Sequence, residues 1–211
     1  MLVDTLLIIV LLLNFALLGT SRLRASINAS AAQGLVLGGL ALAVPSESGL
    51  WPAALAVTTI AAKAGLVPWL LHRAMREAAV RREATPLVGY VASLLLGALA
   101  TGVAIAFAGM LPLAADHAGS RVVPASLATV LTGFLLLTTR RKAISQVVGY
   151  LVLENGIFIM GLLLAKAIPA FVELGVLLDL LVAIFVLGIM INNINREFAS
   201  LDTSRLSTLK D

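Results

Sequence analysis

Cysteine is absent from this 211-residue chain. Disulfides, zinc sites with thiolate ligands, iron–sulfur clusters and cysteine nucleophiles are therefore excluded. Histidine is scarce as well: His72 and His117 both fall near the ends of apolar segments, so we do not expect a bis-histidine haem within a membrane. Charged residues make up 12% of the chain, whereas soluble domains carry about 25%. The chain thus has few side chains with which to cover a water-facing surface.

Apolar residues predominate instead. They account for 60% of the chain, and the mean hydropathy is +1.05, which is typical of a polytopic membrane protein. The formal net charge of +4 does not indicate a nucleic-acid partner, because the basic residues lie between the apolar runs, where membrane topology signals occur.

Seven apolar segments approach the roughly 20 residues that a membrane-spanning helix needs. They cover residues 2–19, 29–44, 50–71, 87–113, 122–138, 147–165 and 170–192. The second is short, and its Gly34 and Gly38 have the GxxxG spacing that allows two helices to approach closely. The sequence therefore predicts an all-α membrane protein with about seven transmembrane helices.

The distribution of basic residues predicts the orientation of these helices. With the N-terminus outside and the C-terminus in the cytoplasm, the outer connections hold only Arg121 and Lys166. The inner loops and tail then hold twelve basic residues, namely Arg22, Arg24, Arg73, Arg76, Arg81, Arg82, Arg140, Arg141, Lys142, Arg196, Arg205 and Lys210. Such an asymmetry follows the positive-inside rule.

Three charged residues lie well inside the apolar segments, away from the segment ends: Lys63, Glu154 and Asp179. An ionised Asp or Lys at a helix centre costs about 2.5–3.5 kcal/mol on insertion scales. Such residues face the protein interior, pair, or lose their charge. Either they form a polar staple between helices, or they have a role in transport.

Their depth favours a proton path. At 1.5 Å per residue, Glu154 and Asp179 both fall near the middle of consecutive antiparallel helices, where desolvation brings a carboxyl pKa closer to neutrality. Lys63 precedes Pro68, whose missing N–H frees a backbone carbonyl at a polar, bendable point. Glu173 is an interfacial charge or the outer mouth of the same path.

No motif for catalysis or cofactor binding accompanies these charges. The sequence has no phosphate-binding glycine loop, no paired metal-ligand spacing and no Ser-His-Asp arrangement. We therefore expect no catalytic centre and no cofactor on this chain, and we assign redox chemistry to partners.

The stretch after Arg140 carries a family resemblance. A basic pair, a helix reading VVGYLVLENGIFI and a second helix with a central acid resemble the K-type membrane protein of respiratory complex I and the C-type component of multisubunit cation/proton antiporters. Two membrane glutamates are implicated in proton transfer in those families. By resemblance, Glu154 and Asp179 are their counterparts, although Glu154 stands one helical turn after the family position.

The whole chain, including KAGLVPWLLHRAM around Lys63 and the ending NNINREFASLDTSRLSTLKD, resembles the hydrogenase-4 component E family. The resemblance implies three parts: a four-helix membrane region (1–121), a region like the K-type protein of complex I (122–192) and a cytoplasmic tail (193–211). It also implies partners that resemble antiporters and the H-type and J-type membrane proteins of complex I, in a bacterial or archaeal cytoplasmic (inner) membrane. A peripheral hydrogenase arm would carry the nickel–iron and iron–sulfur centres.

Three functions remain open at this point. The chain is a non-catalytic subunit that adds Glu154, Asp179, Lys63 and Glu173 to a proton or cation path, a purely structural scaffold, or a part of an antiporter with no redox arm.

Overall fold

The computed structural model describes residues 2–43, 57–77, 83, 86–111, 121–164 and 188. Every regular element within these ranges is a helix, and five of the helices are long and apolar enough to cross a membrane. These five are α1 (Leu2–Gly19), α2 (Leu23–Ala43), α5 (Tyr90–Met110), α6 (Val122–Thr139) and α7 (Ala143–Leu164). The prediction of a helical membrane protein is confirmed. Apart from residue 188, the predicted seventh segment, which contains Glu173 and Asp179, lies outside the described residues.

The predicted third segment is helical from residue 57 and runs past its expected end, as the π-helix η1 (Ile60–Leu66) followed by α4 (Val67–Glu77). Within η1, the Val67 N–H donates to the carbonyl of Ala62, five residues back. A proline at position 68 cannot donate to the carbonyl four residues back and collides with it in an α-helix. The wider π register, which often occurs at functional sites, relieves that conflict.

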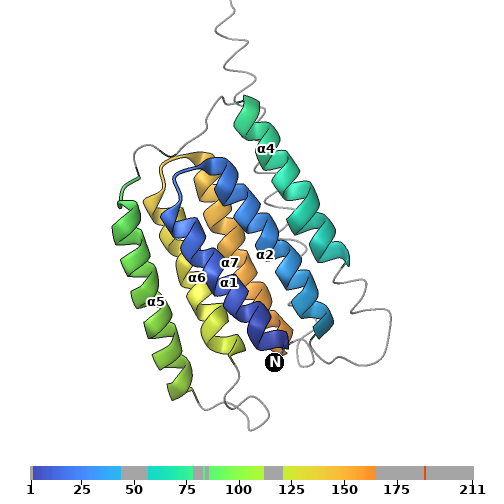
Figure 1. Cartoon of the computed structure of the whole chain (residues 1–211), viewed down its shortest axis with the longest axis vertical. Helices are drawn as coiled ribbons and strands as arrows, with labels where there is room; N and C mark the ends of the chain where they lie inside the picture. Colours follow the sequence, from blue (N-terminus) through green and yellow to red (C-terminus); the bar gives the residue numbers. More distant parts are fainter. Residues whose placement is uncertain are drawn as a thin grey trace, which may run out of the picture.

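The helices lie side by side in one bundle (Figure 1). α4 and α5 form the two edges, and α1, α2, α6 and α7 lie between them. α1 ends, α2 begins, α6 ends and α7 begins at the same end of the bundle, which we call the Glu83 end after the buried loop residue found there. Glu154 lies near the middle of α7, far from both ends of the bundle.

Glycine allows the central helices to pack backbone against backbone. A Cβ at Gly156 of α7 would lie 2.6 Å from the backbone nitrogen of Val130 on α6, and one at Gly149 would lie 2.7 Å from that of Leu137. On α2, a Cβ at Gly34 would lie 2.7 Å from the Cβ of Lys63. The predicted close approach at the GxxxG spacing is thus confirmed for Gly34, and the helix that approaches it carries Lys63.

Two apolar clusters form the core, and a polar layer separates them. The cluster at the Glu83 end includes Leu17, Leu23, Ile27, Leu71, Leu136, Val148 and Val152. The cluster toward the other end includes Leu7, Val10, Leu37, Leu40, Ala125, Ile159 and Leu162. Between them along the helices come buried polar residues, namely Asn14, Ser30, Gln33, Lys63, Ser126, Thr129, Thr132, Glu154 and Asn155.

At the Glu83 end, two helices begin earlier than their apolar runs predict. α2 starts at Leu23 and α7 at Ala143. The α7 start has a specific cause, because the Glu83 carboxylate accepts hydrogen bonds from the backbone N–H groups of Arg141 (3.2 Å) and Lys142 (3.1 Å) and from the Ser145 hydroxyl (2.7 Å). A carboxylate there satisfies the orphan donors of the helix and complements its dipole.

Candidate functional site

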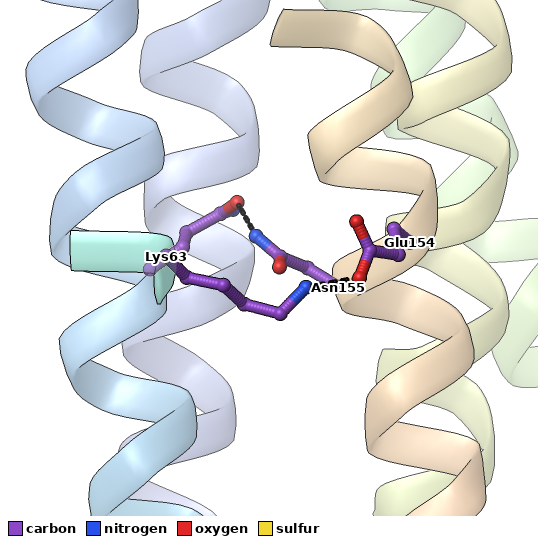
Figure 2. A network of polar contacts seen from close by, with 4 residues as sticks. Lys63, Glu154 and Asn155 are labelled. Atoms are coloured by element: carbon purple, nitrogen blue, oxygen red, sulfur yellow. Dashed lines mark hydrogen bonds and ion pairs between the residues drawn. The ribbon is translucent and has the colours of Figure 1, made fainter. Parts of the chain in front are cut away.

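Lys63 and Glu154 form a buried ion pair in the middle of the bundle. The Lys63 Nζ lies 2.5 Å from Glu154 Oε1, and the two side chains are 4% and 1% exposed. Figure 2 shows Lys63 extended toward α7, where Glu154 and Asn155 are neighbours on the same helix. The pair joins residues 91 positions apart in the sequence.

Local structure directs Lys63 to this place. The π register of η1 and the absence of a side chain at Gly34 let the Lys63 backbone lie directly against α2. Its ammonium group also lies 6.0 Å from the centre of the Phe158 ring on α7. A ring face at that distance attracts a cation, so α7 holds the ammonium through both a carboxylate and an aromatic ring.

A chain of amide hydrogen bonds leads away from the pair across three more helices. The Asn155 Nδ2 donates to Gln33 Oε1 of α2 (3.1 Å), and the Gln33 Nε2 donates to Asn14 Oδ1 of α1 (2.7 Å). The Asn14 Nδ2 then donates to Thr129 Oγ1 of α6 (2.9 Å), whose hydroxyl donates to the carbonyl of Ala125 (2.7 Å). The amide donors all point in the same direction, from α7 through α2 and α1 to α6, so these four side chains form one ordered network.

A buried ion pair such as this one costs folding free energy unless all of its polar atoms are hydrogen-bonded. A function can account for a pair that carries such a cost. Desolvating two charges offsets most of their attraction, and apolar residues of similar volume stabilise a core at least as well. A membrane interior sharpens that cost, and ionisable residues there mark proton or ion pathways. Lys63 and Glu154 are therefore the leading candidate functional residues within the described ranges.

The structure brings together two of the predicted residues. Lys63 and Glu154 meet. Asp179, which the sequence placed at a similar depth on the next helix, lies with Glu173 outside the described residues, so its relation to Glu154 stays a prediction. Three members of the network, Asn14, Gln33 and Thr129, were missed. The signal that singled out the charged residues also marks them, since each is a polar side chain inside an apolar run.

Metal binding finds no support in this part of the chain. Across the described ranges, no group of three or more histidine, cysteine, aspartate or glutamate side chains is placed to hold a metal ion. His72 lies in α4, where its Nε2 is 2.9 Å from Asn28 Oδ1 of α2. Burial, followed by the charges of Arg24 and Arg76, lowers the pKa of His72, so its imidazole stays neutral near pH 7.

Comparison with known proteins places the chain among two groups of relatives. It is 41% identical over 161 residues to the uncharacterized protein Rv0085 of Mycobacterium tuberculosis, a match that covers 75% of this chain and 72% of that protein. It is 33% identical over 85 residues to hydrogenase-4 component E of Escherichia coli and of Shigella flexneri, covering 40% of this chain and 39% of those proteins. No protein-family model and no solved structure matches the chain.

Proposed function

The chain belongs to the family of the mycobacterial protein Rv0085, and from this premise we propose that it is a non-catalytic membrane subunit of a hydrogenase-type, complex I-like redox assembly. Its role is to contribute the Lys63–Glu154 pair to a proton path. The partial similarity to hydrogenase-4 component E and the membrane-spanning character of the helices support membership in such a complex.

The observation that carries the proton path is the buried pair itself. Glu154 is 1% exposed and its Oε1 lies 2.5 Å from the Lys63 ammonium group, so an ionisable carboxyl group and its counter-charge lie together inside the bundle. Separating the two charges in a dry region favours the neutral forms, because burial disfavours both ions. Movement of Lys63 toward and away from Glu154 therefore alternates the carboxyl group between proton release and proton uptake.

Two further acids belong to the proposal. Asp179, and Glu173 toward the outer face, would continue the route from Glu154 on the following segment. Nickel–iron and iron–sulfur centres would reside on partner subunits, and the membrane neighbours would resemble antiporters and the H-type and J-type proteins of complex I. We place the chain in a bacterial or archaeal cytoplasmic membrane, with seven spans and the Glu83 end facing the cytoplasm.

A structural scaffold is the second candidate, and the amide network favours it. Asn155, Gln33, Asn14 and Thr129 connect four helices through hydrogen bonds of 2.7–3.1 Å, which is what a polar staple requires. In that case a Glu154→Gln substitution lowers the amount of assembled complex. The proton-path proposal instead predicts that the complexes which do assemble with this variant have altered proton movement.

Co-purification tests membership in the complex. The tagged chain is extracted from its own membranes in mild detergent, and the proteins and metals that accompany it are identified. Nickel–iron and iron–sulfur subunits are the expected companions. Antiporter subunits recovered without any redox protein would overturn the hydrogenase-type assignment and favour a cation/proton antiporter.

A further inference from the structure

A small cavity lies at the Glu83 end of the bundle, away from the ion pair. It has about 10 Å³ of room for the centre of a water molecule, which is close to the minimum that one buried water needs. Four apolar side chains form part of its wall, and six polar residues form the rest: Thr20, Ser21, Ser26, Glu83, Arg140 and Ser145. A cavity with this lining is polar enough to hold water.

Arg140 supplies an independent sign of a ligand there. Its side chain is buried at 3% exposure, its Nη2 donates to the Leu18 carbonyl at the end of α1 (2.7 Å), and its guanidinium lies 4.7 Å from the centre of the Tyr90 ring. Its Nη1 has no hydrogen-bond partner among the described residues. Because a buried unpaired donor on a charged group is costly, the cavity is the natural place for a water molecule that accepts from Nη1.

One face of α2 leads from this cavity to the polar layer. Ser26 lines the cavity, Ser30 is buried one turn further on, and Gln33 belongs to the amide network. From Ser26 to Gln33 the helix rises about 10 Å. Leu23 and Ile27, both in the apolar cluster at the Glu83 end, border this face and restrict it to transient water.

We propose that this cavity is a proton port, which exchanges protons between the aqueous phase at the Glu83 end and the Lys63–Glu154 pair along the Ser26–Ser30–Gln33 face of α2. The inference rests on the proposed function. Each hydroxyl on the route accepts a proton on its oxygen, releases its own onward to transient water, and rotates back before the next transfer. The Gln33 amide hydrogen-bonds that water and does not itself carry the proton. The Arg140 cation orients the port water with its hydrogens toward other acceptors.

Radiolytic footprinting tests the port without reference to the redox partner. Hydroxyl radicals generated by X-rays from bound water oxidise the side chains around it, even buried ones. In the full-length protein in detergent, we expect oxidation of Leu17 and Leu136, which line the cavity although they are 1% and 3% exposed. Leu7 and Leu40, each 1% exposed in the other cluster, are the controls. Equal absence of oxidation at all four leucines contradicts the port.

Substitution of Ser30 tests the route in the intact complex. Ser30→Val removes the hydroxyl and has the same shape as Ser30→Thr, which keeps it, and loss of one hydrogen-bonding step of ordinary strength slows proton delivery by about tenfold. Ser30→Thr restores the hydroxyl and should restore the rate. Thr138→Val, at an exposed position on α6, is the control. If Glu154→Gln stops proton movement and Ser30→Val does not, the port is wrong and the proposed function stands. If neither variant affects it, the proposed function itself fails.

Discussion

At the scale of single residues, the molecule is built around one charge pair that its apolar surroundings do not favour. Lys63 and Glu154 are each the other's counter-charge in a layer whose other side chains are neutral, four of which form one series of hydrogen bonds. Removal of either partner leaves an isolated buried charge, whereas removal of both leaves a neutral layer. The two situations differ in free energy, and this difference is measurable.

A double-mutant cycle measures the pair. We expect Lys63→Met and Glu154→Gln each to destabilise the protein by about 3–5 kcal/mol if the remaining group stays charged. The double variant should be more stable than either single variant, since it buries no charge. Unfolding of the purified protein in detergent provides the values, and strictly additive losses would show that the two side chains do not interact.

The lowered pKa of His72 leads us to expect that the stability of the protein depends on pH. Burial lowers the pKa of His72 in the folded protein, whereas an unfolded histidine takes up its proton below about pH 6.5. As the pH falls, the unfolded chain therefore binds more protons than the folded protein. The contribution of His72 to the free energy of unfolding is complete above about pH 6.5 and is lost as the pH falls through the folded pKa. Thermal unfolding across this range should show the loss in wild type and a smaller one in His72→Gln. Identical profiles would contradict it.

At the scale of helices, small residues rather than apolar ones set the distances. Gly133, Gly149 and Gly156 place α6 and α7 in backbone contact, and Gly34 does the same for α2 and η1. The apolar runs predicted most helix positions because length and hydropathy fix where a chain crosses a membrane. They did not predict the early start of α7, since its cap, Glu83, comes from a loop distant in sequence.

Substitution of helix glycines by alanine distinguishes the cost of overpacking at a helix contact from the gain in helix propensity. Gly156→Ala puts a Cβ 2.6 Å from the Val130 nitrogen, and overpacking of this kind costs about 1–3 kcal/mol. Gly102→Ala on α5 is the matched control, because nothing lies within 4 Å of its added Cβ, and it should stabilise the helix by about 0.5–1 kcal/mol. Chemical unfolding distinguishes the two, and a Gly156→Ala variant as stable as Gly102→Ala would rule out the close contact.

At the scale of the whole molecule, the sequence predicted the class of protein and two of the residues at the site but not their pairing. Lys63 and Glu154 stood out because any charge inside an apolar run does. That they contact each other depends on how α2, η1 and α7 pack, and one sequence holds no record of that packing. The predicted division at residue 121 and the role of Asp179 remain predictions.

The orientation of the bundle is also a whole-molecule prediction, and the absence of cysteine makes it easy to test. Arg121 and Lys142 are exposed at opposite ends of the bundle, and Arg121 approaches Asp4 near the start of α1 (3.8 Å). In intact cells, a membrane-impermeant maleimide should label Arg121→Cys, and should label Lys142→Cys only after permeabilisation. The reverse pattern would invert the topology and move the proton port to the outer face.

Proton movement by the assembled complex is the direct measure of the central claim. In membrane vesicles, redox turnover and proton translocation are recorded together for wild type, Glu154→Gln and the control Asp4→Asn, whose carboxylate lies at the far end of α1. With rates expressed per assembled complex, we expect Glu154→Gln to move protons about tenfold less per turnover, with Asp4→Asn unchanged. A Glu154→Gln complex that assembles and translocates protons at the wild-type ratio would contradict a proton path through this pair.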